Sequence, residues 1–236
     1  MINNMSRKLK RYIKRKAKRK KNRIHTIHIP SREPTKNNYS LENIFNLIID
    51  SFIKDKIGIA DNFLSESLAL NLTNNLTALY EDSRLKLAGT GDSKSVAFRG
   101  NFRGDIIYWL DRKNNDVHEN SFFDLMDLFV QYLNDTCYTG ITSYEFHYTL
   151  YQTGTCYKKH LDQFRENDSR KYSMIMYLNK NWIQEDGGEL CIHHAAGLQN
   201  ISPNNGKSVF FQSNELEHEV LITNKPRMSI TGWLKV

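Results

Sequence analysis

A histidine and an aspartate separated by one residue are the first groups in this sequence whose types and spacing could do chemistry. His160 and Asp162 fall in a stretch typical of a β-strand, CYKKHLDQF, where a period of two sends both side chains to one face. His218 begins another predicted strand much later in the chain. Two imidazoles and one carboxylate leave the other coordination positions of a metal open, which suits non-haem iron(II), whereas a closed zinc site needs a fourth ligand. We therefore predict an open metal site at His160, Asp162 and His218.

An arginine follows the second histidine, on the next predicted strand. Arg227 begins RMSITGW, and a guanidinium that projects into an apolar interior needs an anionic partner, which its planar fork binds bidentately if the partner is a carboxylate. A dicarboxylic co-substrate would supply that partner. The hydroxyl groups of Tyr177, in MIMYLNKNW, and of Thr231, on the same strand as Arg227, could add hydrogen bonds to it.

Each of these residues carries little weight alone, because a single histidine on a strand is more often structural than a ligand. Their order along the chain carries more: HLD is followed by YLNKNW, GGEL, HEV and RMSITGW. The complete series favours a functional site over a chance pattern.

The elements that must position these residues divide the chain into two parts. The spacing of apolar residues predicts helices that begin at Leu41 and after Ser65, the latter ending near Glu81, and a further helix over Phe122–Leu133. Beyond Gly140, about seven short β-prone runs follow without helical patterns between them. We expect a mostly β (α+β) fold, a double-stranded β-helix of the jelly-roll type with N-terminal helices packed on one sheet. One domain is expected over residues 39–236, with its catalytic barrel core at about 141–236.

The N-terminal segment differs from the rest in charge. Residues 7–23 contain twelve of the 33 basic side chains and no acid, so the remainder has 21 basic groups against 26 acidic ones. A block of like charge cannot bury a core, and we predict a disordered basic tail and linker over residues 1–38. The segment 6–23 could bind RNA, a ribosome or an anionic membrane, or it could be a solvated tail, and the sequence leaves these readings open.

Composition excludes several classes of protein. The chain is 39% hydrophobic and 25% charged, which is typical of a folded globular protein. No run of 18 or more apolar residues predicts a transmembrane segment, and the N-terminus lacks the apolar core of a secretion signal, so we expect a cytoplasmic protein. Three cysteines without a Cys-x-x-Cys pair predict reduced thiols.

Three segments resemble a known family of enzymes. YQTGTCYKKHLDQF, YSMIMYLNKNWIQEDGGEL and LEHEVLITNKPRMSITGW are together similar to the prolyl hydroxylase branch of the iron(II)/2-oxoglutarate-dependent oxygenases, which includes the hypoxia-sensing prolyl hydroxylases. Upstream, FRGDIIYWLD resembles the Arg-x-Asp and Trp segment that precedes the barrel core in that branch. The similarity covers approximately Ile57 to Val236 and leaves the basic tail and the first helix unexplained.

The resemblance implies a dioxygenase that hydroxylates a prolyl residue in a protein or peptide substrate and releases succinate and CO2. Iron(II) would be held by His160, Asp162 and His218, with O2 as co-substrate and ascorbate as a reductant. 2-Oxoglutarate would form a salt bridge to Arg227. The remaining matched positions are Tyr177 and Tyr151 in the co-substrate pocket, and Arg103, Asp105, Arg170 and Trp233 near the peptide groove.

Other functions are compatible with parts of this pattern. An oxygenase acting on nucleic acid could use the basic tail for recruitment, but such demethylases usually carry a second arginine soon after the co-substrate arginine, and MSITGWLKV has none. A non-catalytic RNA- or ribosome-binding module on the same fold would not need HLD, HEV and Arg227. A zinc hydrolase would leave Arg227 without a partner. The oligomeric state is not predicted.

Two further pairs of residues have simpler interpretations. His193 and His194 are adjacent, so on a strand they face opposite ways and do not easily join one metal site; we interpret them as rim or surface residues. Gly187 and Gly188 predict a tight turn between strands.

Overall fold

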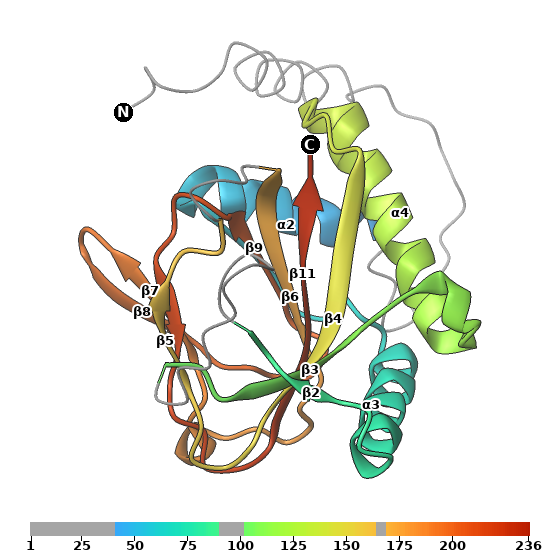
Figure 1. Cartoon of the computed structure of the whole chain (residues 1–236). Coiled ribbons are helices and arrows are strands. Elements are labelled where there is room, and N and C mark those ends of the chain that lie inside the picture. The colour runs from blue at the N-terminus through green and yellow to red at the C-terminus, as the bar shows by residue number, and fades with distance from the viewer. Residues whose placement is uncertain (1–40, 90–101, 164–168) are drawn as a thin grey trace, which may run out of the picture.

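The computed structural model describes residues 41–89, 102–163 and 169–236 (Figure 1). The predicted tail at 1–38 lies outside these residues. The described helices are α2 (Leu41–Asp55), α3 (Glu66–Glu81) and α4 (Val117–Cys137), with short 3-10 helices η1 (Arg112–Asn114) and η2 (Gln184–Asp186). The strands are β1 (Ile57–Ala60), β2 (Lys86–Leu87), β3 (Asp105–Trp109), β4 (Ser143–Tyr151), β5 (Tyr157–His160), β6 (Arg170–Tyr177), β7 (Leu190–His194), β8 (Gly197–Ile201), β9 (Ser208–Gln212), β10 (His218–Val220) and β11 (Arg227–Lys235).

The strands form a larger and a smaller antiparallel sheet. The larger sheet has the order β1-β9-β6-β11-β4-β3-β2, and the smaller has the order β5-β10-β7-β8. A buried apolar cluster between them includes Ile175 and Tyr177 from the larger sheet and Leu190 and Ile192 from the smaller. The two facing sheets confirm the predicted double-stranded β-helix.

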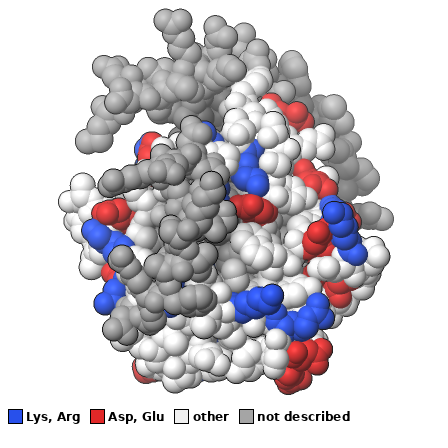
Figure 2. Space-filling view, in the orientation of Figure 1, with Lys and Arg blue, Asp and Glu red and all other residues white. Residues whose placement is uncertain are grey.

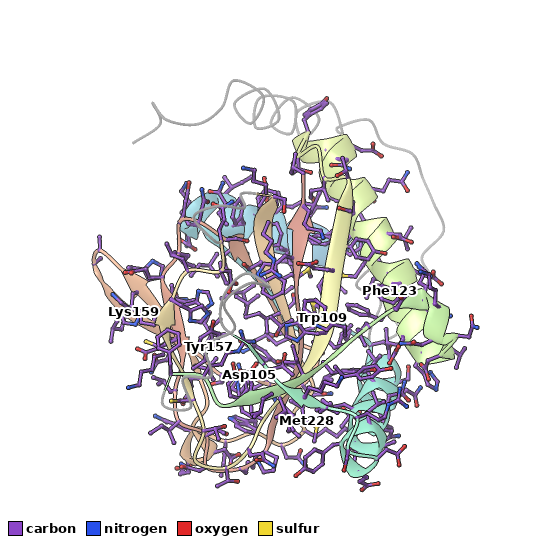
Figure 3. All side chains as sticks on the ribbon, in the orientation of Figure 1. Asp105, Trp109, Phe123, Tyr157, Lys159 and Met228 are labelled. Atoms are coloured by element: carbon purple, nitrogen blue, oxygen red, sulfur yellow. The ribbon has the colours of Figure 1, made fainter. Side chains whose placement is uncertain are left out.

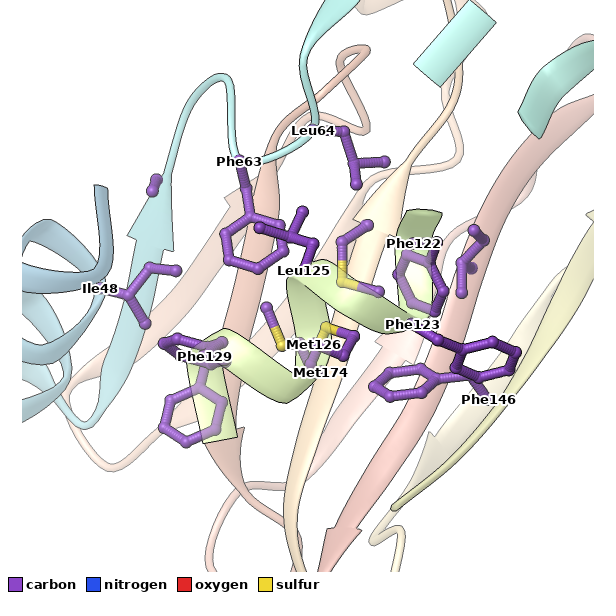
Figure 4. Packing of buried hydrophobic residues seen from close by; sticks show 14 of the residues in the cluster. Ile48, Phe63, Leu64, Phe122, Phe123, Leu125, Met126, Phe129, Phe146 and Met174 are labelled. Atoms are coloured by element: carbon purple, nitrogen blue, oxygen red, sulfur yellow. The ribbon is translucent and has the colours of Figure 1, made fainter. Parts of the chain in front are cut away.

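The other face of the larger sheet carries the main core. Alternate residues of its central strands, including Phe146, Met174 and Ile230, pack against apolar residues of the three helices. Figure 4 shows Phe122 and Phe129 of α4 within this packing. Phe122 meets Phe146 edge-on with ring centroids 5.1 Å apart. The helices therefore cover one face of one sheet, as predicted, and leave the opposite face to pack against the smaller sheet. No helix in the described parts of the chain is both long and apolar enough to span a bilayer.

Helix α4 is longer than the predicted helix over Phe122–Leu133. The side chain of Asp116 caps it by accepting hydrogen bonds from the backbone N–H groups of His118 (2.9 Å) and Glu119 (2.8 Å). Aspartate is a favoured N-cap, so the helix begins at Val117, in a polar stretch where apolar periodicity gives no signal.

Strands β3 and β8 are among those that went unpredicted, because their sequences lack regular alternation. β8, GLQNI, is mostly exposed and pairs only with β7 among the described strands. β3 lies in DIIYW and pairs with β4, which brings Asp105 opposite Tyr151. Tertiary pairing, and not the local pattern, determines both strands.

Glu119 is a buried carboxyl group in the first turn of α4, and it lowers stability at high pH. Burial and the nearby Asp116 raise the pKa of Glu119 to about 7. Because this pKa exceeds the usual value, the protein loses stability as pH rises from about 4.5 through 7, by up to about 3 kcal/mol. We expect Glu119→Gln to raise the free energy of unfolding at pH 8 by an amount of this order. Urea unfolding should show almost no difference at pH 4, and an equal gain at both pH values would contradict the assignment.

Candidate active site

Three metal-binding side chains meet at the mouth of the space between the sheets. His160, at the end of β5, is the cross-strand partner of His218, at the start of β10. Oδ1 of Asp162 lies 3.4 Å from Nε2 of His160 and 3.7 Å from Nε2 of His218. One donor atom from each residue lies within 4.8 Å of the other two. The structure therefore brings the three predicted ligands to one point, where they could hold a metal ion.

The reason given for the approach of His160 and Asp162 was wrong in one respect. β5 ends at His160, and Asp162 lies in the bend that follows, so strand periodicity does not orient its carboxylate. Ser173 orients it instead, because its hydroxyl donates a hydrogen bond of 2.6 Å to Oδ2 of Asp162. The Ser173 hydroxyl also lies 2.9 Å from that of Ser213, and both serines are buried.

Backbone carbonyl groups hold both imidazole rings with Nε2 directed at the site. Nδ1 of His160 lies 2.7 Å from the carbonyl oxygen of Lys158, and Nδ1 of His218 lies 3.0 Å from that of Leu216. Since a carbonyl only accepts, each Nδ1 donates and each Nε2 presents its lone pair to a metal. This is the tautomer that a metal ligand requires.

The electrostatics favour the ligand forms of the same groups. Burial lowers the pKa of His218, so that ring is neutral at neutral pH. Burial alone would raise the pKa of Asp162, but His218, His160 and the Ser173 hydrogen bond together hold it far below its usual value. A neutral imidazole and an ionised carboxylate are the forms that bind metal.

A stack of side chains supports His160 from the side of β3. The ring of Tyr157 stacks on His160 with centroids 3.6 Å apart, and the Arg103 guanidinium lies 4.6 Å from the Tyr157 centroid. Arg103 also binds the buried carboxylate of Asp105 through Nε (2.6 Å) and Nη2 (2.9 Å). Figure 3 shows Asp105 and Tyr157 between the smaller sheet and the central strands. Arg103 and Asp105, predicted near the peptide groove, thus pair with each other and support an imidazole of the metal site.

Arg227 lies deeper, fully buried at the start of β11. Its Nε donates a hydrogen bond of 2.7 Å to the carbonyl oxygen of Gly188, while Nη2 has no partner among the described residues. The rings of Tyr151 and Tyr177 flank the guanidinium, with centroids 5.2 Å and 5.1 Å from Cζ. A buried, unpaired guanidinium N–H is costly, and a carboxylate is the group that satisfies it best.

The hydroxyl of Tyr177 adds a second free hydrogen-bonding group. It is buried and has no partner among the described side chains. Burial raises the pKa of Tyr177 to about 12, although Arg227 opposes this, so the phenol stays protonated and can donate. Arg227 and Tyr177 therefore fit the distal carboxylate of 2-oxoglutarate. Thr231 also lies on the inner face, with its hydroxyl 3.4 Å from that of Ser229.

The turn at Gly187 and Gly188 helps to position Arg227. Both residues have positive φ (64° and 67°), as the prediction of a tight turn requires, although the turn links η2, and not a strand, to β7. A Cβ on Gly188 would lie 3.0 Å from Cδ of Arg227. Glycine at 188 thus allows the carbonyl group to approach the guanidinium, a role that the sequence alone did not predict.

Aromatic rings and one ion-pair network line the inner face of the larger sheet near the C-terminal end of β11. The Arg170 guanidinium lies 3.6 Å from the centroid of Trp233 and binds Glu145 at 2.7 Å. Trp109, 47% exposed, lies 6.3 Å from Trp233 and 4.9 Å from His147, centroid to centroid. Burial lowers the pKa of His147 to about 4, so this ring is neutral. Trp109 is the exposed ring of this group, because Trp233 and His147 are buried, and it could contact a peptide.

Ser173, Tyr157 and Gly188 support the site but were not predicted as members of it. Ser173 is a small polar residue within the apolar strand YSMIMY, and that exception was the available signal. Tyr157 lies three residues before His160 on β5, and Gly188 is the second glycine of a pair. Their partners come from distant segments, which local patterns do not reveal.

Comparison with known proteins places this geometry in a family. The family model of the 2OG-Fe(II) oxygenase superfamily matches residues 146–235, a range that contains His160, Asp162, His218 and Arg227. A crystal structure of a prolyl-4-hydroxylase from Pseudomonas putida is 30% identical, with 81% of this chain and 98% of that chain covered and a TM-score of 0.73.

Two mammalian relatives and a second solved structure are also prolyl hydroxylases. The prolyl hydroxylase EGLN3 of Mus musculus, like that of Homo sapiens, is 26% identical over 193 residues, which is 73% of this chain and 75% of the relative. A prolyl hydroxylase from Trichoplax adhaerens, solved with a peptide fragment of the oxygen degradation domain of hypoxia-inducible factor, has the same fold. It is 23% identical, with 83% of this chain and 90% of that chain covered and a TM-score of 0.74.

The fold, the donor set and the relatives define the class of protein. The chain belongs to the 2OG-Fe(II) oxygenase superfamily and is a 2-oxoglutarate-dependent dioxygenase. Within that superfamily it is a prolyl hydroxylase-like member.

Proposed function

We propose that this dioxygenase hydroxylates a prolyl residue in a protein substrate, consuming O2 and 2-oxoglutarate and releasing succinate and CO2. The observation that carries the proposal is the buried Nη2 of Arg227, which has no partner among the described residues, together with the ligand set His160, Asp162 and His218. The 30% identity to the Pseudomonas putida prolyl-4-hydroxylase supports the prolyl assignment.

The metal ligands and the residues around Arg227 have distinct roles in the reaction. When bound, iron(II) and 2-oxoglutarate supply the oxidising chemistry: one oxygen atom of O2 enters succinate, the other enters the substrate C–H bond, and CO2 leaves. His160, Asp162 and His218 hold the metal through three donors and so leave positions for the co-substrate. Arg227 and Tyr177 would bind its distal carboxylate, and the apolar residues around them would keep water from it.

The substrate surface in this proposal consists of Trp109, Trp233 and Arg170. Trp109 is half-exposed, and beside it Arg170, which pairs with Glu145, stacks on the buried ring of Trp233. The Trichoplax adhaerens relative was solved with a peptide, which supports a peptide substrate here. The internal pairing of Arg103 with Asp105 favours a positioning role for that pair, and the exposed Trp109 is then the aromatic residue available for substrate contact.

The prolyl assignment is tested by a direct search for the product. Mass spectrometry of proteins from cells that express the wild type, or the His160→Ala variant, should reveal prolyl residues with a +16 Da shift in the wild type only. Peptides that span those residues should then support stoichiometric succinate release by the purified enzyme. Succinate release that depends on iron, with a shift on a residue other than proline, would retain the dioxygenase and overturn the prolyl assignment.

A recruiting role for the basic tail is a separate proposal that rests on charge. Residues 7–23 hold twelve cations, whereas Figure 2 shows acidic and basic side chains on the described part of one face without a continuous patch of either sign. We expect removal of residues 1–24 to lower RNA affinity at least ten-fold at low salt, because released counterions drive such binding. Filter binding over a salt series checks this, with a tail whose twelve cations are changed to glutamine as the matched control. Equal affinity and equal salt dependence in the truncated chain would identify a solvated tail.

The other functions are less well supported. An oxygenase that acts on nucleic acid would be expected to carry a second arginine soon after Arg227, and this chain has none there. A non-catalytic module would not need an intact ligand set. Cytoplasmic location and ascorbate as reductant stay predictions from the sequence and from the resemblance.

A further inference from the structure

A second group of metal-binding side chains lies on the outer face of the smaller sheet. Cys191 and His193 on β7 and Glu219 on β10 each offer one donor atom, and these atoms all lie within 4.8 Å of one another. We propose that Cys191, His193 and Glu219 form a second metal site, for a divalent ion of the zinc class. The proposal does not depend on the hydroxylase function.

Strand alternation explains how the three side chains reach one face. His218 points inward to the first metal site, so Glu219, the next residue, points outward. The antiparallel register pairs His218 with Ile192, which belongs to the core between the sheets, and pairs Glu219 with Cys191. His193, two residues after Cys191, returns to the same outer face. Figure 3 shows Lys159 of β5 on this outer side, away from the side where Tyr157 lies.

Distances and exposure make the cluster accessible to an ion. Nε2 of His193 lies 2.8 Å from Oε1 of Glu219, and the two side chains are 24% and 28% exposed. The Cys191 side chain is buried beneath them. In the parts of the chain that the structure describes, Glu219 forms its ion pair with His193, while the nearby Lys159 pairs with Glu217. No lysine or arginine in those parts therefore neutralises the Glu219 carboxylate.

The donor set selects the kind of metal. A thiolate, an imidazole and a carboxylate suit zinc, whereas magnesium and calcium prefer oxygen ligands alone. Three protein ligands leave a fourth position of the tetrahedron for water. Binding would displace the thiol proton and join β7 to β10, the strand that carries His218.

A simpler explanation predicts a different result. His193 and Glu219 could form a hydrogen bond across the strand pair, with Cys191 as a small buried apolar residue beside it. That arrangement would take up no metal. Metal binding through the thiol of Cys191 therefore distinguishes the two explanations.

Cobalt(II) is the most direct probe, because a cobalt–thiolate bond gives an intense near-ultraviolet charge-transfer absorption that imidazole and carboxylate do not. Titration of the full chain should develop this absorption to a plateau at one thiolate-bound cobalt per chain. Cys191→Ser should abolish it. Cys156→Ser, at a cysteine outside the cluster, and His160→Ala, in the first site, should both retain it.

Further variants keep the test valid if Cys191→Ser fails to fold. His193→Ala and Glu219→Gln, at partly exposed positions, should each weaken cobalt binding at the thiolate site at least ten-fold. Equilibrium dialysis against zinc(II) should count two ions per wild-type chain and one per Cys191→Ser chain. A wild type without the absorption, its persistence in Cys191→Ser, or unchanged affinity in His193→Ala would each overturn the second site.

Discussion

Replacing Arg227 with alanine should weaken binding of 2-oxoglutarate by roughly 30-fold or more, because loss of one partner from a buried charge pair costs about 2–5 kcal/mol. The effect is large here because the guanidinium is fully buried and its Nη2 has no partner in the described protein. Without it, the distal carboxylate of the co-substrate would lie desolvated beside Tyr151 and Tyr177. Calorimetry under anaerobic conditions, with iron(II) present, measures the change in Kd.

Two controls separate this effect from a general loss of structure. Arg227→Lys keeps the charge but loses the fork that reaches both Gly188 and the ligand, so its Kd should lie between those of the wild type and Arg227→Ala. Arg170→Ala removes a guanidinium that stacks on Trp233 outside the co-substrate pocket, and its Kd for 2-oxoglutarate should stay within a few-fold of the wild type. Unchanged 2-oxoglutarate affinity in a folded Arg227→Ala protein would refute the assignment.

Replacing Asp162 with alanine should lower iron(II) affinity by at least about 100-fold and make succinate release undetectable. Asp162 is the one anionic ligand of the three, and its Oδ1 lies within 4 Å of Nε2 of both His160 and His218. Loss of an outer-shell partner typically costs about 10- to 100-fold in metal affinity, and loss of the charged ligand itself should exceed that. Metal content after dialysis and succinate release measure the two effects.

A graded series makes the second prediction specific. Ser173→Ala removes the hydroxyl that orients the Asp162 carboxylate, so its loss of iron affinity should fall in the 10- to 100-fold range. His194→Ala removes a histidine that bonds Gln199 and is outside the cluster of ligands, and it should retain wild-type iron content. Iron content in Asp162→Ala equal to that of the wild type would contradict the ligand assignment.

The sequence predicted the fold from its strand patterns, and the side chains of His160, Asp162 and His218, which it singled out, lie together in the structure. His218 and Arg227 begin predicted strands, and the observed elements β10 and β11 begin at these residues. Helices packed on one sheet followed from apolar spacing, which α2 and α3 match closely. The density of short β-prone runs then sufficed to predict two facing sheets.

The sequence did not predict the contacts that orient the ligands, because these cross between segments far apart in the chain. Ser173 on β6 reaches Asp162 in the bend after β5, and the carbonyl group of Gly188 reaches Arg227. Hydrogen bonds of this kind depend on register and turn geometry, which residue type and spacing do not specify. Asp162 shows the point most clearly, since its place in the site was predicted and the physical reason was not.

The structure gives Arg103, Asp105 and His193 partners that the sequence did not predict. Arg103 and Asp105 were expected near the peptide, and the structure adds a buried ion pair that supports the Tyr157–His160 stack. His193 was interpreted as a rim residue, and it lies beside Cys191 and Glu219 on the outer face of the smaller sheet. Residue type alone could not reveal either partner set.

The central claim is that the three metal ligands and Arg227 form a single site, in which metal and co-substrate bind together. The most direct test measures the Kd of 2-oxoglutarate with and without iron(II) in the wild type and in His160→Ala, under anaerobic conditions. Ligands that share one site are linked reciprocally, so iron(II) should tighten 2-oxoglutarate binding at least ten-fold in the wild type and have little effect in His160→Ala. A wild-type Kd for 2-oxoglutarate that does not change when iron(II) is added would contradict the account.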